Sequence, residues 1–313
     1  MEILGESVPQ EVVFIMAIVL GVLISLLSIF YLLSKSKPSN MMDELLLRTQ
    51  SWLYIAIGVA ILIIAPAIIG TILVAYVSFI ALREMFSISY FREADRTALG
   101  IAYLAIPIQY YFAYHGMYQP FLFFIPVVMF IGLPVLLVLA GKTKGIAVSM
   151  CLIPTLLMLT IYMLSHIILL FSMDIPNFEI GASGLILFLI LCTSFNDVFQ
   201  FTWGKLFGKK KITPTISPNK TWAGFIGGIF TTALLGYFLK FLTPLTGVQA
   251  MLLGLTLGIV GFLGDLVISA IKRDLKIKDT GDLIPGHGGV MDRLDSLILT
   301  TPVFYYMLVF FIK

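Results

Sequence analysis

Long apolar runs separated by short polar segments dominate this chain. We identify ten runs, at roughly 11–33, 51–65, 66–86, 98–115, 119–140, 145–172, 181–203, 221–242, 248–271 and 296–312. Runs of about 20 apolar residues cross a bilayer as helices, because a helix satisfies its own backbone polar groups in lipid. The pattern predicts an all-α polytopic integral membrane protein, a bundle of about ten transmembrane helices.

Two parts of this pattern are ambiguous. Residues 51–86 are too long for one span and short for two, and we place the break near Pro66. Residues 34–50 form a polar connector after the first run, and we expect its segment 41–48 (MMDELLLR) to lie along the membrane surface.

Composition and charge support a membrane protein and predict its orientation. The chain is 59% hydrophobic and 12% charged, whereas soluble domains carry about 25% charge. With the N-terminus outside, only Lys240 and Lys313 of the 20 Lys and Arg residues fall on the outer side. This bias follows the positive-inside rule. The net charge of +3 is too small to argue for a nucleic-acid partner.

One polar stretch, residues 261–296, interrupts the apolar pattern near the C-terminus. It contains six of the 17 acidic residues: Asp265, Asp274, Asp279, Asp282, Asp292 and Asp295. An apolar chain rarely collects intramembrane charge without a functional reason.

The spacing of these residues predicts a site for a cation and phosphates. Asp265, Ser269 and Lys272 are spaced i, i+4, i+7, which places them on one helical face. A glycine-rich turn at 285–289 allows backbone N–H groups to approach a ligand. Asp292 and Asp295 follow, just before the last apolar run. Carboxylates suit Mg²⁺, and the bases between them suit phosphate oxygens.

The alternative interpretation of this stretch is a charged cytoplasmic loop. Asp292 and Asp295 would then only cap the last helix, and Lys272 and Arg273 would anchor the preceding helix at the headgroups. Asp265 fits this alternative least well, because a carboxylate within an apolar run is costly.

A second polar cluster lies at 194–221. Asp197 and Asp265 lie 16 and about 17 residues into their predicted helices, so both are about 25 Å from the outer surface. At one depth they could share a cavity, or they could be two unrelated buried polar residues. Asn196 and Gln200 flank Asp197.

A basic and helix-capping segment completes this cluster. Its four lysines at 205 and 209–211 predict attraction to anionic headgroups. Ser217 before Pro218 predicts an N-cap with proline at the first helical position. A helix N-terminus that carries Lys220 can bind phosphate.

These motifs resemble the phosphatidate cytidylyltransferase (CDP-diacylglycerol synthase) family. The resemblance is carried by Ser269-x-x-Lys272-Arg273, Lys278-Asp279 and His287-Gly288-Gly289-x-x-Asp292-Arg293-x-Asp295, which together span 27 residues. WGKLFGKKK and SPNKTWAGFIGG at 203–228 are similar to the same family, and a looser likeness begins near residue 47. We therefore predict an anchor and connector at 1–46, a helical bundle at 47–180 and a catalytic domain at 181–313.

The resemblance implies an activity and a set of residue roles. It implies cytidylyl transfer from CTP to phosphatidate at the cytoplasmic face of the cytoplasmic (inner) membrane, by a homodimer that uses Mg²⁺, alone or together with a second cation. Asp265, Lys272 and Asp292 would be catalytic. Metal ligands would come from Asp265, Asp292, Asp295 and Asp197. Substrate would contact Ser217, Lys220, Ser269, Arg273, His287 and Asp279.

Two departures from the family pattern leave alternatives open. The family often has Glu where this chain has Ile268, and more often has Ala where it has Asn196. A paralogue that acts on another lipid phosphate, a lipid or polyprenol kinase, and an ion-conducting transporter remain alternatives. Release of pyrophosphate would separate the transferase from the kinase. A transporter would spread its carboxylates through the membrane depth, whereas here they gather near the inner face.

Overall fold

The computed structural model describes residues 8–36, 39–284, 286 and 288–312, and helices make up most of this part of the chain. The first half contains α1 (Gln10–Ser36), α2 (Asn40–Ile64), α3 (Ala67–Ile88), the 3₁₀ turn η1 (Glu93–Asp95), α4 (Arg96–Tyr114), α5 (Tyr118–Phe123), the π-helical η2 (Phe124–Met129), α6 (Phe130–Leu139), α7 (Ile146–Leu157), the π-helical η3 (Met158–Tyr162), α8 (Met163–Leu169) and the 3₁₀ turn η4 (Leu170–Ser172).

The second half contains the helices that carry most of the chemistry. They are α9 (Gly181–Phe207), the strands β1 (Lys211–Thr213) and β2 (Ser217–Thr221), α10 (Trp222–Phe238), the 3₁₀ turn η5 (Lys240–Leu242), α11 (Gly247–Asp274) and α12 (Met291–Ile312).

Each of the ten predicted apolar runs falls on a helix or on consecutive helical segments. Within the described residues, eight helical stretches are long and apolar enough to cross a membrane. The other two predicted runs are α4, with 19 residues, and α10, with 17. The chain is therefore an all-α polytopic membrane protein, as predicted. Its orientation across the membrane stays a prediction.

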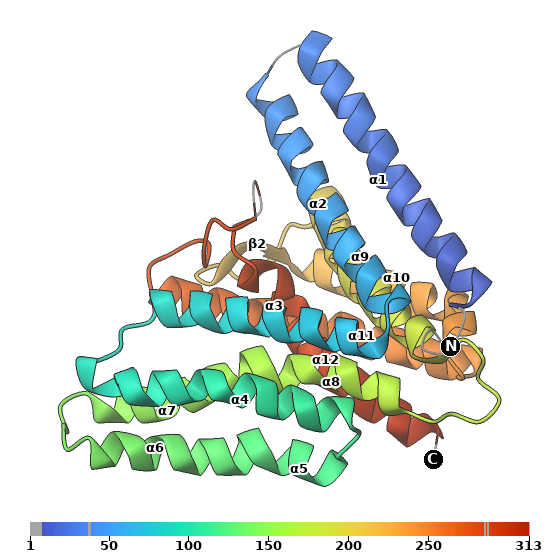
Figure 1. The fold of residues 1–313 in the computed structure, drawn as a ribbon. Helices are drawn as coiled ribbons and strands as arrows, with labels where there is room; N and C mark the ends of the chain where they lie inside the picture. The colour runs from blue at the N-terminus through green and yellow to red at the C-terminus, as the bar shows by residue number, and fades with distance from the viewer. Residues whose placement is uncertain (1–7, 37–38, 285, 287, 313) are drawn as a thin grey trace.

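Several boundaries differ from the predictions. The break at Pro66 is confirmed, because α2 ends at Ile64 and α3 begins at Ala67. The connector predicted at 34–50 is shorter, because residues 41–48 form the first turns of α2. Their placement along the membrane surface stays a prediction. The side chain of Ser39 starts that helix by accepting a hydrogen bond from the Met42 amide, at 3.3 Å. The α1–α2 pair projects from the remaining helices in Figure 1.

Small residues let α9, α10 and α11 pack closely. A Cβ atom on Gly236 of α10 would lie 2.5 Å from the carbonyl oxygen of Ala250, and one on Gly254 of α11 would lie 2.7 Å from that of Thr232. Such close approach is typical of helices that associate in lipid, where van der Waals contact replaces the hydrophobic driving force.

Asn196 joins the same three helices by hydrogen bonds. Its Nδ2 donates to the Gly258 carbonyl at 3.2 Å, and its Oδ1 accepts from the Thr232 hydroxyl at 3.1 Å. The side chain is fully buried. The role of Asn196, left open by the sequence, is to connect α9 with α10 and α11 directly beside Asp197.

The predicted helix cap at Ser217 is wrong. Ser217–Thr221 is a strand that pairs antiparallel with β1, with Thr213 opposite Ser217 and Lys211 opposite Thr221. The N-cap of α10 is Thr221, whose hydroxyl accepts from the Gly224 amide at 3.1 Å. Four further residues in extended conformation therefore separate Ser217 from the helix.

This correction yields a paired prediction. Thr221→Ala should lower the free energy of unfolding by about 1 kcal/mol, because it leaves a helix-terminal N–H without its acceptor. Ser217→Ala should change it by less than about 0.5 kcal/mol. Thermal unfolding of both variants in detergent checks this order, and a larger loss from Ser217→Ala would contradict the capping assignment.

Candidate active site

A cavity of about 290 Å³ lies among α9, β2, α11, α12 and the segment between the last two helices. Every residue that lines it is ionisable: Asp197, Lys220, Asp265, Lys272, Asp279, Asp292, Arg293 and Asp295. Asp197 and Asp265 thus share one cavity, which is the first of the two alternatives that their predicted depth left open. Seven of these eight residues were predicted site residues, and Arg293 is the addition.

The predicted face of α11 is present. The Ser269 hydroxyl donates to Asp265 Oδ1 at 3.0 Å, and Lys220 Nζ lies 2.6 Å from Asp265 Oδ2. One turn further along, Lys272 Nζ donates to Asp292 Oδ1 at 2.7 Å. Ser269 therefore orients Asp265 from the same helix. Lys220 connects β2 to α11 through Asp265, and Lys272 connects α11 to α12 through Asp292.

Asp292 is the most extensively hydrogen-bonded carboxylate of the cavity. Beyond Lys272, its Oδ2 accepts from the Thr280 amide at 2.8 Å, from the Thr280 hydroxyl at 3.1 Å and from the Gly289 amide at 2.9 Å. The residue is buried and belongs to the first turn of α12, which begins at Met291 and not near 296 as predicted. Asp292 therefore joins the helix to the segment that precedes it.

Glu84 on α3 also supports this corner of the cavity, and the sequence analysis missed it. Its Oε1 accepts from the Val290 amide and its Oε2 from the Met291 amide, both at 2.9 Å, and Oε2 also accepts from the Thr280 hydroxyl at 3.2 Å. A carboxylate on the free amides of a helix N-terminus is stabilising. A glutamate within the apolar run 66–86 was the signal that the sequence offered.

The glycine-rich turn contacts these carboxylates closely. A Cβ atom on Gly289 would lie 2.5 Å from Glu84 Oε2 and 2.8 Å from the amide nitrogen of Gly281. The backbone approach that the sequence predicted toward a ligand is used here for the protein's own carboxylates. His287 lies outside the described residues.

Asp197 on α9 and Asp295 on α12 both accept hydrogen bonds from Ser296. The Ser296 hydroxyl donates to both oxygens of Asp197, at 3.2 and 3.1 Å, and the Ser296 amide donates to Asp295 Oδ1 at 2.7 Å. Within the described residues neither carboxylate forms an ion pair. Their carboxyl oxygens are therefore available to a cation.

Lys220 is the positive centre on the other side of the cavity. Burial by itself would lower the pKa of its ammonium, but the nearby carboxylates of Asp265 and Asp197 and the hydrogen bond to Asp265 outweigh burial and raise the pKa above its usual value. Lys220 is therefore charged at neutral pH and can hold an anion.

The donor set fits a divalent cation. Five carboxyl groups and three basic side chains line the cavity, so potential oxygen ligands outnumber the bases. Carboxylate oxygens are the ligands that Mg²⁺ prefers. Among the described residues, no three acidic, His or Cys groups are arranged to hold a metal ion. Asp265 and Asp292 are instead paired with Lys220 and Lys272.

Two predicted site residues lie elsewhere. Arg273 is exposed, and its guanidinium donates to the carbonyls of Ile216 at 3.1 Å and Ile277 at 3.3 Å, where it connects the strand pair to α11. Ser217 lies on β2 and does not line the charged cavity. Ile268, where the family often has Glu, is buried in the apolar core.

The fold and the cavity define a polytopic membrane protein with a site for charged groups formed by its C-terminal helices. The Cytidylyltransferase family model matches residues 46–311. The chain belongs to this family and is a nucleotidyltransferase.

Individual relatives agree with this assignment. The uncharacterised Escherichia coli (strain K12) protein YnbB is 38% identical over 275 residues, which cover 87% of this chain and 89% of that protein. The Bacillus subtilis (strain 168) phosphatidate cytidylyltransferase is 44% identical over 110 residues, 34% of this chain and 41% of that protein. The Staphylococcus aureus (strain COL) phosphatidate cytidylyltransferase is 39% identical over 136 residues, 42% of this chain and 52% of that protein. The matches to these two enzymes span about half of their length or less.

The position of Glu84 yields a prediction. Glu84→Gln presents an NH₂ group to one of two backbone N–H donors at the start of α12. We expect turnover to fall at least about tenfold, because an unsatisfied buried donor costs about 1–3 kcal/mol and Asp292 shifts with the helix end. Cytidylyl transfer assays check this, together with faster proteolysis between α11 and α12.

The control for Glu84 is Glu93→Gln, which changes an exposed glutamate of η1 in the same way. It should leave both turnover and proteolysis unchanged. Equal turnover in Glu84→Gln and the unmodified protein would show that Glu84 does not position the site.

Proposed function

We propose that this protein transfers the cytidylyl group of CTP to phosphatidate, giving CDP-diacylglycerol and pyrophosphate. The carrying observation is the cavity itself: five carboxyl groups, two lysines and an arginine gathered by helices of a membrane protein. The names of the partial relatives support phosphatidate as the acceptor. Another lipid phosphate is the alternative, because the relative that covers most of the chain is uncharacterised.

The reaction is a displacement at phosphorus. An oxygen of the lipid phosphate forms a bond to the α-phosphorus of CTP, while the bond from that phosphorus to the bridging oxygen breaks and its electron pair leaves with pyrophosphate. The attacking oxygen is already anionic, so the reaction needs no strong general base. The principal barrier is the repulsion between two anions, which fixed positive charge and alignment reduce.

The residues of the cavity supply these functions. Lys220 and Lys272 would hold phosphate oxygens, and Arg293 lines the same space. Asp265 and Asp292, with Asp295 and Asp197 as further candidates, would hold Mg²⁺. A bound Mg²⁺ ion would neutralise the triphosphate and align it for attack. Ser269 orients Asp265, whereas Thr280, Gly289 and Glu84 orient Asp292 and its helix.

The location of the site is part of the proposal. The bias of Lys and Arg favours an N-terminus outside and a site that faces the cytoplasm, in the cytoplasmic membrane. CTP would reach the cavity from the cytosol, and the acceptor phosphate would already lie at headgroup depth. Family resemblance further implies a homodimer.

The direct test uses purified protein with α-labelled CTP, Mg²⁺ and phosphatidate. We expect label in the extracted lipid and equimolar release of pyrophosphate. Production of a nucleoside diphosphate with transfer of the terminal phosphate would instead identify a kinase. Lack of lipid labelling with phosphatidate, but labelling with another lipid phosphate, would assign the alternative acceptor.

The carboxylates are tested by substitution. Asp265→Asn and Asp292→Asn keep side-chain size but remove a charge, and each should lower turnover at least about 100-fold, since a metal-assisted step involves several kcal/mol. Both variants should still insert and elute as the unmodified protein. Lys205→Ala, at an exposed position of α9, is the control and should keep near-full turnover. Full CTP-dependent activity in both Asn variants would remove the metal-site proposal.

A further inference from the structure

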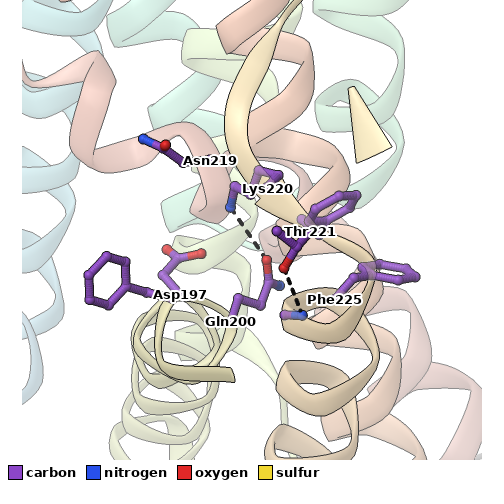
Figure 2. Close-up of a pocket in the computed structure, with 9 residues that line it drawn as sticks. Asp197, Gln200, Asn219, Lys220, Thr221 and Phe225 are labelled. Carbon is purple, nitrogen blue, oxygen red and sulfur yellow. Dashed lines mark hydrogen bonds between the residues drawn. The ribbon is translucent and has the colours of Figure 1, made fainter. Parts of the chain in front are cut away.

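A second, smaller cavity of about 110 Å³ adjoins the charged one and shares Asp197 and Lys220 with it. Figure 2 shows Asp197 and Gln200 on α9 below Lys220, with Thr221 and Phe225 on the other side. Its lining differs in character from that of the charged cavity. The lining residues are Asp197, Gln200, Phe201, Asn219, Lys220, Thr221, Gly224, Phe225 and Phe262.

Gln200, which lines this cavity, carries a buried amide with one unused hydrogen-bond donor. The residue is 5% exposed, and its Oε1 accepts from Lys220 Nζ at 3.4 Å. An ammonium can only donate, so the amide oxygen must face Lys220 and Nε2 must face away from it. Nε2 has no hydrogen-bond partner among the described residues. A buried donor without a partner is unfavourable, and a ligand with an acceptor would relieve that cost.

The side chain of Gln200 is held in place by α10. A Cβ atom on Gly228 would clash with Cγ of Gln200 and would lie 3.1 Å from its Cα. Glycine at 228 therefore makes room for the Gln200 stem between α9 and α10. The amide is a fixed group and not a mobile surface side chain, as a recognition element requires.

The cavity lies at an apolar face of the molecule. Phe201, which lines it, is 68% exposed, and Ile226 and Phe230 on α10 are 62% and 64% exposed. In a membrane protein, exposed apolar helix faces contact lipid. A ligand group can thus enter this cavity from the bilayer, whereas the adjoining cavity is lined only by ionisable side chains.

We propose that the smaller cavity binds the glycerol-ester part of the acceptor lipid and that Gln200 Nε2 donates to an ester carbonyl. The lipid phosphate would then lie at Lys220, where the two cavities meet, and the nucleotide would occupy the charged cavity. This inference rests on the proposed function and adds a specificity determinant to it: the site prefers an acyl ester to an ether-linked lipid. Phe201, Phe225 and Phe262 supply the apolar wall.

The test compares two acceptors that differ only in the carbonyl groups. We would measure kcat/KM with diacyl phosphatidate and with its dialkyl-ether analogue, in the unmodified protein and in Gln200→Met. The unmodified protein should prefer the diester about tenfold, the value of one buried hydrogen bond. Gln200→Met should reduce this preference to less than about twofold, through a lower kcat/KM for the diester.

The controls separate recognition from folding. The preference is a ratio within one preparation, so partial unfolding cancels. Gln200→Glu, which keeps the size of the side chain but loses the NH₂ donor, is the second variant and should also lose the preference. Gln109→Met changes another buried glutamine, which lies on α4 and does not line this cavity. Its Nε2 donates to the Phe121 carbonyl. This variant should keep the preference for the diester. The shift in Tm that each of the two lipids causes, measured in the same variants, compares their binding without turnover.

Three outcomes would overturn the inference. The first is an unchanged diester preference in both Gln200 variants. The second is equal use of the two acceptors by the unmodified protein. The third is a raised KM for CTP in Gln200→Met with the acceptor preference intact, which would assign the amide to the cytosine base. In each of these cases lipid labelling by the unmodified protein still upholds the proposed function, whereas absence of labelling with every lipid phosphate removes both.

Discussion

The Asp292 carboxylate is the interaction on which the geometry of the site depends. It accepts hydrogen bonds from a lysine of α11 and from two residues of the segment that leads into α12. Removing one partner of such a buried pair leaves an uncompensated charge, which is far more costly than the loss of a surface pair. Glu84 adds a second carboxylate from α3 to the same helix start, so the N-terminal half of the chain helps to define a site formed mainly by the C-terminal half.

Close packing of α9, α10 and α11 allows an apolar protein to contain this charged cavity. Glycines on α10 and α11 bring the helix backbones into contact, and Asn196 uses the proximity to form hydrogen bonds to both. Asp197, the next residue, then points into the cavity with Gln200 one turn later. The charged groups face inward or toward the segment between α11 and α12, whereas the outer faces of α9 and α10 carry exposed aromatic and aliphatic side chains. This arrangement keeps ionised groups away from hydrocarbon.

The two adjoining cavities explain how one site could accept two chemically unlike substrates. The larger one offers only ionisable groups, as a triphosphate and a divalent cation require. The smaller one combines three phenylalanines with the amides of Gln200 and Asn219, which would suit the ester region of a lipid. Lys220 belongs to both, and its raised pKa keeps it cationic at the point where two phosphates would meet. We regard this shared lysine as the link between nucleotide and acceptor.

The sequence by itself determined the class of fold and most of the charged site. Run length and hydropathy predict the helices, because the bilayer leaves the backbone few alternatives, and helical periodicity placed Asp265, Ser269 and Lys272 on one face. Tertiary structure decided what local rules cannot: that Thr221 and not Ser217 caps α10, because strand pairing takes Ser217, and that Arg273 binds backbone carbonyls outside the cavity. It also decided the contacts of Glu84, which lies more than 200 residues from the amides it caps. Contacts at such separation depend on how helices pack, and a single sequence carries no local signal of that packing.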